Sequence, residues 1–201
     1  MTNNLRYIIK NPARGEIKIK KSSFIGNLEY ASSRDEAELF INKINKKFYD
    51  ATHNCYAYRI SSEKLRCYDD GEPSGTAGRP ILQMLEKHHL VKSVLMVTRY
   101  FGGIKLGRGG LLRAYSQCAE ETILSTELEM EIFFQKILLT YSYKFVKNVQ
   151  NVTEKYNGVI VNSDFKVYIK SRIEIPSKNY EKFKIELMNS SSGEIQIEEL
   201  S

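Results

Sequence analysis

Two glycine-rich segments carry the residues of this chain that could do chemistry. The first, residues 69–80, reads DDGEPSGTAGRP and contains three acids, and the second, residues 98–110, reads TRYFGGIKLGRGG and contains three bases. Glycine is costly to order, so it is used where the backbone needs a positive φ angle or must let a ligand come close. Most of the 12 glycines of the chain lie in these two segments, which therefore mark a candidate site.

The second segment predicts an anion-binding loop. It lies between a buried-strand pattern and a predicted helix, so its backbone N–H groups would point outward at the positive end of the helix dipole, where phosphate binds. Its spacing matches neither a Walker motif nor GxGxxG and indicates neither ATP nor a dinucleotide. The alternative is that its glycines serve only tight turns and close packing. The nucleic-acid or anion-binding candidates are Arg99, Tyr100, Gly102, Gly103, Lys105, Arg108, Gly109, Gly110 and Arg113.

The first segment offers carboxylates whose role the sequence leaves open. They could hold a hard cation or act as general acid or base, with a histidine as a further proton carrier. Alternatively, they pair with Arg79 or with the arginines of the second segment, an interpretation we favour because such acid–glycine clusters are common in turns. We expect no catalytic residue and no metal, and assign a motif surface of unknown role to His53, Asp69, Asp70, Glu72 and Thr76.

Two further patterns are weaker indications. His53 and Cys55 share a face if they lie on a strand, which allows a Cys/His nucleophile pair, but a small buried cysteine is the more common use. Aromatic rings near the two segments could stack on unpaired bases, although such rings more often line a core. These rings belong to Tyr56, Tyr58, Tyr100 and Phe101.

The composition is that of an ordinary folded protein with a basic excess. The chain has 201 residues, of which 42% are hydrophobic and 27% charged, and its net charge is +6. These values exclude disordered and fibrous classes and favour anionic partners. Its three cysteines have no CxxC pair and fit reduced thiols. Because no apolar stretch has the length of a signal peptide or a membrane span, we expect a cytoplasmic protein without a membrane partner. We also expect no cofactor.

The elements that position the two segments follow from the hydrophobic pattern. Ser33 and Glu36 form a capping box that opens a helix whose apolar residues recur every three or four positions. Pro80 is tolerated in the first turn of a second helix, and an almost continuous apolar run predicts a strand buried on both faces. In this part of the chain we predict strands over 16–30, 53–60 and 93–100, and helices over 33–48, 81–88 and 111–125.

The last third of the chain predicts a ferredoxin-like domain, because its elements follow the order βαββαβ. There is no long repeat and no Pro-rich linker, so we expect a short join between domains. The fold class is therefore α+β, with an N-terminal domain over residues 1–134 and a ferredoxin-like domain over residues 135–201. In the second domain we predict strands over 136–143, 159–161, 166–175 and 194–198, and helices over 144–156 and 180–188.

The motifs resemble those of the IMPACT/YigZ family in its bacterial two-domain form. The resemblance covers residues from about 20 to 125 and is carried by HNC at residues 53–55, DDGEPSGTAG with Pro80, TRYFGG, Leu106 and Gly107, GGL at residues 109–111 and RAY at residues 113–115. It implies an N-terminal α/β domain with the left-handed βαβ fold of ribosomal proteins and translation factors, followed by a ferredoxin-like domain.

The resemblance also implies an association with translation. Eukaryotic relatives resemble regulators of translation under amino-acid starvation that act on protein partners through an extra N-terminal domain, a mechanism we do not expect for a chain that starts at the shared domain. No established catalytic residue comes with the resemblance. We therefore predict a translation-associated regulatory or binding protein, and not an enzyme, that contacts RNA or the ribosome through a basic glycine-rich face. The alternatives are an enzyme on a phosphorylated or carboxylated small molecule, or a protein-interaction module.

Overall fold

The chain folds into two compact units. The structure, a computed structural model, describes residues 5–200, and residues 1–4 and 201 lie outside the described part. The units divide between Glu131 and Ile132, a few residues before the boundary expected from the sequence. Both units combine helices with antiparallel sheets, so the protein is an α+β protein of two units. Each unit is described below by itself, as unit 1 and unit 2.

Unit 1 is built on a five-stranded antiparallel sheet in the order β2-β3-β6-β4-β5. The central strand β6 has seven of its eight residues buried, which confirms the prediction from its apolar run. Strands β3 and β4 both run antiparallel to β6 and are therefore parallel to each other. The strands are β2 (Ala13–Ile19), β3 (Ser22–Tyr30), β4 (His53–Arg59), β5 (Leu65–Tyr68) and β6 (Ser93–Tyr100).

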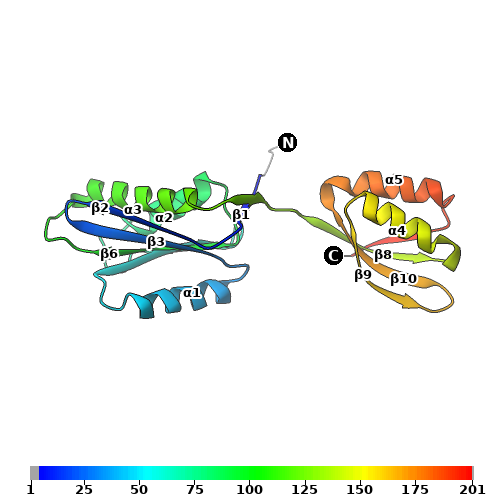
Figure 1. Cartoon of the computed structure of the whole chain (residues 1–201), viewed down its shortest axis with the longest axis horizontal. Coiled ribbons are helices and arrows are strands. Elements are labelled where there is room, and N and C mark those ends of the chain that lie inside the picture. The colour runs from blue at the N-terminus through cyan, green and yellow to red at the C-terminus, as the bar shows by residue number, and fades with distance from the viewer. Residues whose placement is uncertain (1–4, 201) are drawn as a thin grey trace. The chain divides into compact units, whose positions relative to one another are not determined.

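Helices cover both faces of this sheet. Figure 1 shows α1 (Arg34–Lys47) on one face and α2 (Gly78–Lys87) with α3 (Gly107–Leu124) on the other. Strand β6 contributes to both cores, since Met96 belongs to the cluster under α1 and Leu95 to the cluster under α2 and α3. A strand buried on both faces reads as a continuous apolar run instead of an alternating one.

Helix α1 begins where the sequence predicts, and one of its two capping interactions is shifted by one residue. Ser33 Oγ accepts a hydrogen bond of 3.2 Å from the backbone N–H of Glu36. The Glu36 carboxylate in turn accepts from the backbone N–H of Ser32 at 2.7 Å, one position before the usual partner in a capping box. Such caps stabilise a helix by about 1 kcal/mol because they satisfy N–H groups that have no partner within the helix.

Three features of unit 1 differ from the prediction. Helix α3 begins at Gly107 and not near residue 111. The prediction placed its first turn in a loop because glycine has a low helix propensity. The short strand β5 was not predicted. Strands β1 (Tyr7–Ile9) and β7 (Leu128–Met130) pair antiparallel and were also missed, because three residues are too few to show a period of two.

Unit 2 confirms the predicted order βαββαβ. Its antiparallel sheet has the order β11-β8-β10-β9, and α4 and α5 lie on the same face of it (Figure 1). Ile137 and Ile173 of the sheet pack in one core with Phe183 of α5. The elements are β8 (Phe134–Tyr141), α4 (Val146–Lys155), β9 (Val159–Phe165), β10 (Ile169–Pro176), α5 (Tyr180–Ser190) and β11 (Gln196–Leu200), with short 3-10 turns at Tyr143–Phe145 and Ser177–Asn179.

Candidate functional site

The two glycine-rich segments meet at one cleft in unit 1, which we call the loop cleft. Its volume is about 470 Å³. It is bounded by the start of β4, by the first segment, and by the second segment with the start of α3. The lining residues are Thr52, His53, Glu72, Pro73, Arg99, Phe101, Lys105, Leu106, Gly107, Arg108 and Leu111.

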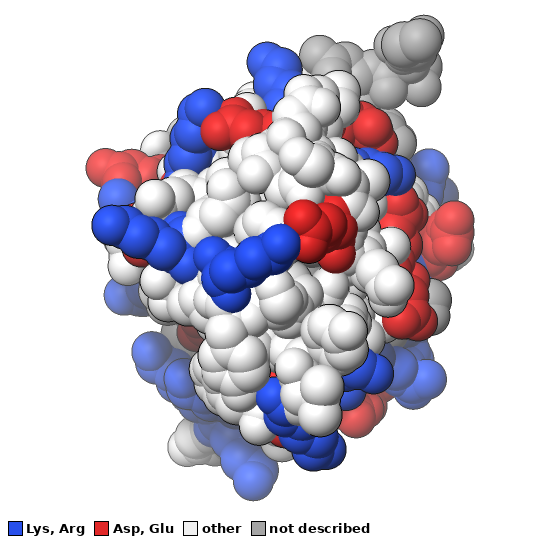
Figure 2. All heavy atoms as spheres, turned by 90° about the vertical axis from the view of Figure 1, so that its right-hand side faces the viewer, with Lys and Arg blue, Asp and Glu red and all other residues white. Residues whose placement is uncertain are grey.

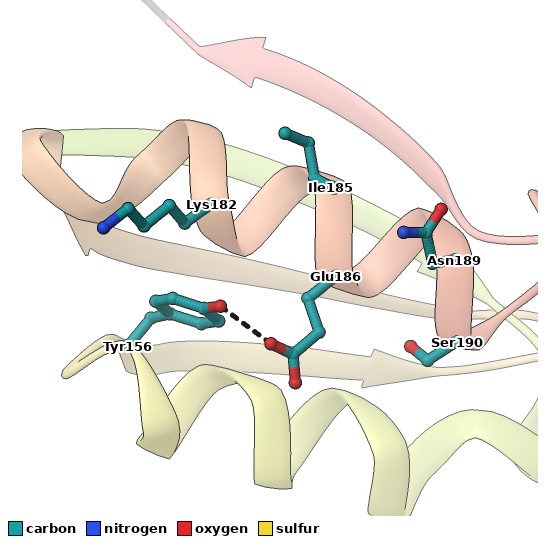
Figure 3. A pocket seen from close by; sticks show the side chains of 6 residues that line it. All are labelled: Tyr156, Lys182, Ile185, Glu186, Asn189 and Ser190. Carbon is teal, nitrogen blue, oxygen red and sulfur yellow. Dashed lines mark hydrogen bonds between the residues drawn. The ribbon is translucent and has the colours of Figure 1, made fainter.

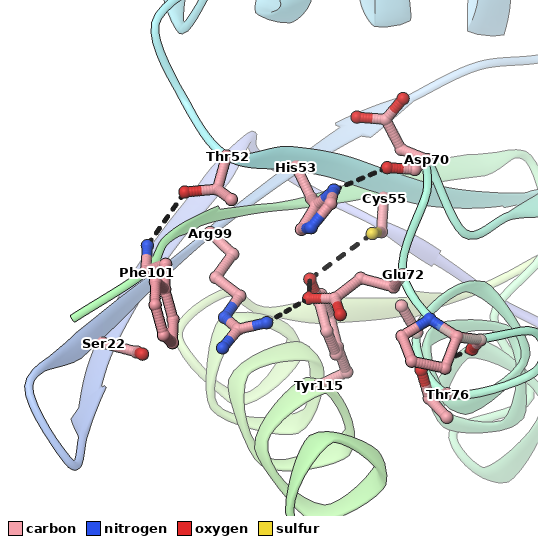
Figure 4. A network of polar contacts seen from close by, with 12 residues as sticks. Ser22, Thr52, His53, Cys55, Asp70, Glu72, Thr76, Arg99, Phe101 and Tyr115 are labelled. Carbon is pink, nitrogen blue, oxygen red and sulfur yellow. Dashed lines mark hydrogen bonds and ion pairs between the residues drawn. The ribbon is translucent and has the colours of Figure 1, made fainter. Parts of the chain in front are cut away.

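A buried ion pair forms the inner wall of the loop cleft. Arg99 Nη1 donates to Glu72 Oε1 at 2.5 Å, and the side chains are only 7% and 3% exposed. The guanidinium carbon of Arg99 lies 5.4 Å from the ring centroid of Phe101 and 5.5 Å from that of Phe24. Figure 4 shows Arg99 between Phe101 and Glu72. Glu72 thus joins the first segment to the strand that leads into the second.

The network continues inward to a tyrosine and a cysteine. The Tyr115 hydroxyl donates to Glu72 Oε1 at 2.9 Å, and Cys55 Sγ lies 3.4 Å from that hydroxyl and donates to the carbonyl oxygen of Asp69 at 3.0 Å. Burial raises the pKa of the Cys55 thiol far above its ordinary value of 9.0. A thiol that keeps its proton is a poor nucleophile, so the structure does not support a Cys/His nucleophile pair.

The carboxylate of Asp69 is used to hold the first segment together. It accepts hydrogen bonds from the backbone N–H groups of Gly75 at 2.8 Å, Ala77 at 3.0 Å and Gly78 at 2.8 Å. These include the start of α2, whose own N-cap side chain makes no capping bond. Because both oxygens of Asp69 are engaged by N–H donors, this residue acts as a structural bracket.

Asp70 fixes the orientation of His53. Its carbonyl oxygen lies 2.6 Å from His53 Nδ1, and its Oδ2 accepts from the backbone N–H of Asn54 at 2.6 Å. A carbonyl oxygen only accepts, so Nδ1 carries the hydrogen and Nε2 lies on the opposite edge of the ring. Thr76, the remaining residue of the predicted motif surface, is buried and donates from Oγ1 to the carbonyl oxygen of Pro73 at 2.6 Å.

Three candidates of the second segment have structural roles. Tyr100 donates from its hydroxyl to Asp50 Oδ1 at 2.8 Å. Gly102 packs directly on the turn between β2 and β3, where an added Cβ would lie 2.0 Å from the carbonyl carbon of Lys21. Gly103 has a φ of +84°, a conformation that glycine adopts without strain. Arg99 is buried as well. The groups that this segment and the following turn of α3 offer to a partner are therefore the exposed cations.

Those exposed cations are Lys105, Arg108 and Arg113. Lys105 and Arg113 form no ion pair within residues 5–200, and Arg108 donates from Nη2 to the carbonyl oxygen of Ser74 at 2.9 Å, which links the two segments. Gly109 and Gly110 lie in the first turn of α3, which contains no acidic residue and receives no side-chain cap. The first N–H groups of α3 are therefore available to an anion.

Sequence reasoning missed the lysines of the turn between β2 and β3. Lys20 and Lys21 have φ values of +45° and +66°, are exposed, and form no ion pair within the described residues. The close contact between Lys21 and Gly102 places this turn beside the second segment. Adjacent lysines in a strand pattern were the only signal, and they could not indicate which loop the turn would meet.

Other surfaces of the described residues are weaker candidates for a binding site. The groove on unit 2 in Figure 3 has a volume of about 610 Å³, and its carboxylate, Glu186, is already bonded to Lys155 and to the Tyr156 hydroxyl. Basic and acidic side chains are interspersed on the face in Figure 2, without a continuous basic patch.

Across residues 5–200, no three His, Cys, Asp or Glu side chains gather as metal ligands would. No helix in this part of the chain is long and apolar enough to cross a bilayer.

Comparisons with known proteins cover both units. Residues 20–123 match the family model described as Impact N-terminal domain. The chain is 34% identical over 194 residues to the IMPACT family member YvyE of Bacillus subtilis, with 92% of this chain and 88% of the relative covered. It is 30% identical over 184 residues to the IMPACT family member YigZ of Escherichia coli, with 90% of each covered. A crystal structure of a hypothetical protein matches 98% of both chains, with a TM-score of 0.72 and 28% identity.

Proposed function

Because the chain belongs to the IMPACT family, we propose that it is a translation-associated binding protein that contacts RNA, free or within the ribosome, through unit 1. The contact surface is a cationic rim around the loop cleft. We define this rim as Lys20, Lys21, Lys105, Arg108 and Arg113.

The observation that carries the proposal is that all five cations are exposed and that none of them forms an ion pair within residues 5–200. Elsewhere many lysines are neutralised, for example Lys87 by Glu120 at 2.5 Å and Lys144 by Glu194 at 2.6 Å. Unpaired cations beside an uncapped helix N-terminus favour a phosphate backbone as the partner, since they can replace the counterions that RNA holds.

The enzyme alternative has a concave site in its favour, but the carboxylates and the cysteine beside that site are already engaged in the fold. Of the carboxylates near the loop cleft, Glu72 is paired with Arg99, and Asp69 and Asp70 accept backbone N–H groups. Cys55 keeps its proton because burial raises its pKa. Within the described residues these groups serve the architecture, which favours binding over catalysis.

Binding of a structured RNA with 5′-hydroxyl ends, measured by fluorescence anisotropy over a salt series, tests the proposal. We expect saturable binding whose log affinity falls with log salt by about 0.7 to 0.9 per neutralised phosphate. The variant Lys105→Glu/Arg108→Glu/Arg113→Glu should bind more weakly and with a flatter slope. Co-sedimentation with ribosomal subunits extends the test to the ribosome.

The matched control reverses three exposed cations of unit 2. The variant Lys147→Glu/Lys178→Glu/Lys182→Glu changes the net charge by the same amount, and none of these lysines forms an ion pair within residues 5–200. We expect it to retain most of the binding. Equal losses in both variants would indicate a non-specific charge effect, and absence of binding to RNA and to subunits at low salt would overturn the proposal.

A further inference from the structure

We propose that the loop cleft binds a phosphate monoester, with the phosphate held between Arg99 and the N-terminus of α3. This goes beyond the contact with RNA backbone proposed above, since it assigns a specific chemical group to the cleft itself. The same chemistry occurs at the 5′ end of an RNA and in a small metabolite such as a nucleotide.

The loop cleft has the size and lining of a small-molecule site. Its volume of about 470 Å³ falls within the range of about 300 to 1,000 Å³ that is usual for ligand pockets. Its apolar lining comes from Pro73, Phe101, Leu106 and Leu111. A phosphate would fill only part of this space, so the apolar wall is left to contact the group that the phosphate is attached to.

The charge of the loop cleft fits a phosphate monoester. Arg99, Lys105 and Arg108 supply three positive charges and Glu72 supplies one negative charge, which leaves a net charge of +2. A phosphate monoester carries a charge of about −1.5 to −2 at pH 7, whereas a backbone phosphodiester or a single carboxylate carries about −1. The monoester therefore neutralises the site most completely.

Arg99 offers a donor that has no acceptor within residues 5–200. Its Nε–H is buried and has no hydrogen-bond partner there, although the side chain is held in place by Glu72. An unsatisfied buried N–H is costly, and in native proteins it often marks the place of a water or an ion. Phe101 packs over this guanidinium and is 44% exposed, so its ring can turn aside to admit an oxygen atom.

The start of α3 supplies further donors. Gly107 has a φ of +71°, and an added Cβ at this position would meet no atom of the described residues within 4 Å. At Gly109 the nearest atom to such a Cβ is Arg113 Nη1 at 3.7 Å. The backbone of this turn is thus open to close approach, and its N–H groups lie at the positive end of an 18-residue helix.

His53 completes the wall opposite the helix. Its Nδ1–H is committed to the carbonyl oxygen of Asp70, which leaves Nε2 on the other edge of the ring. The residue lines the loop cleft together with Arg99 and Arg108. Nε2 can accept a hydrogen bond from a hydroxyl group of the ligand or, when protonated, donate one to a phosphate oxygen.

Position 107 allows a test with a matched pair of variants. Asp and Asn both tolerate positive φ and have the same shape, but only Asp places a negative charge at the helix N-terminus. We expect Gly107→Asp to bind adenosine monophosphate at least about tenfold more weakly than Gly107→Asn, because the two variants differ only in this charge. Binding is followed by amide NMR shifts of residues 107–110 and by the Arg99 Nε–H signal.

Five probes identify the group that is recognised. Inorganic phosphate and adenosine monophosphate should shift these signals, and adenosine should not. If the phosphate belongs to an RNA end, a short RNA with a 5′-phosphate should bind more tightly than the same RNA with a 5′-hydroxyl. If only the mononucleotide binds more tightly with its phosphate, the phosphate belongs to a small metabolite. Both results support the proposal. No shift with either phosphate probe, or equal binding to the Asp and Asn variants, would overturn it, even if 5′-hydroxyl RNA still binds through the cationic rim.

Discussion

Arg99 and Glu72 form a direct ion pair in the interior of unit 1, although they lie 27 positions apart in the sequence. Arg99 is at the end of β6 and Glu72 is in the first glycine-rich segment. The pair fixes the distance between the two segments and forms the floor of the loop cleft. It also buries the side chain of Arg99, which therefore lines the cleft and is not part of the exposed cationic rim.

Removing the charge of Glu72 should destabilise unit 1. The variant Glu72→Gln keeps the shape of the side chain and leaves the Arg99 guanidinium buried without a counter-charge, which typically costs about 3 to 5 kcal/mol. Urea unfolding followed by circular dichroism measures the free energy of unfolding. The control is Glu63→Gln, an exposed glutamate without an ion pair in the described residues, for which we expect a change below about 0.5 kcal/mol. Similar effects of both variants would show that the buried pair contributes little.

Asp69 should control the local stability of the first segment. In Asp69→Asn one of the two oxygens becomes an NH2 group that cannot accept from Gly75, Ala77 or Gly78. We expect the amide hydrogens of these residues to exchange at least about tenfold faster, which corresponds to about 1.4 kcal/mol of local opening. Hydrogen exchange read by NMR gives these rates one by one. Asp164→Asn in unit 2, where the carboxylate is exposed, should leave them unchanged, and unaltered exchange in Asp69→Asn would contradict the bracket role.

Two glycines of the second segment should respond oppositely to alanine. In Gly102→Ala the new Cβ would lie 2.0 Å from the backbone of Lys21, so the turn and the segment must separate, at a cost of about 1 to 3 kcal/mol. In Gly109→Ala the nearest atom is 3.7 Å away, and the higher helix propensity of alanine is worth up to about 1 kcal/mol. Thermal unfolding should therefore show a lower Tm for the first variant and an equal or higher Tm for the second. Equal Tm values would mean that the turn moves freely away from Gly102.

The buried thiols should make the protein less stable at high pH. Burial raises the pKa of Cys118 from 9.0 to about 12 and raises that of Cys55 further. The folded state therefore keeps these protons above pH 9 while the unfolded chain releases them. These thiols do not affect the free energy of unfolding below pH 9. Above pH 9 they lower it as the pH rises, by up to about 1.4 kcal/mol per pH unit for each thiol.

Urea unfolding of wild-type protein and Cys118→Ala between pH 8 and 11 measures this effect. The variant should be less stable at pH 8 because it leaves a small cavity, but its stability should fall less steeply above pH 9, by the contribution of one proton. The slope thus separates the titration of Cys118 from its packing. Parallel pH profiles for the two proteins would show that Cys118 does not titrate differently in the folded state.

Local patterns determined much of the fold. Ser33 and Glu36 located the start of α1, the apolar run of β6 predicted a strand buried on both faces, and the element order of the last third predicted unit 2. Each of these signals lies within a few residues, where periodicity and capping are set by neighbours along the chain. The same local patterns predicted a loop at Gly109 and Gly110, which lie in the first turn of α3. Intrinsic helix propensity does not include the packing that stabilises the rest of this helix.

The candidate site was determined only in part by the sequence. Residue types and glycine content marked both segments, but the sequence could not decide that Arg99 turns inward to Glu72 while Lys105 and Arg113 stay exposed. Nor could it place Lys21 against Gly102. These relationships depend on which strands pair in the sheet, and pairing is decided by the burial of apolar surface over the whole unit. The sequence therefore determined which residues could do chemistry, and the tertiary structure decided which of them share a cleft and which are used to build it.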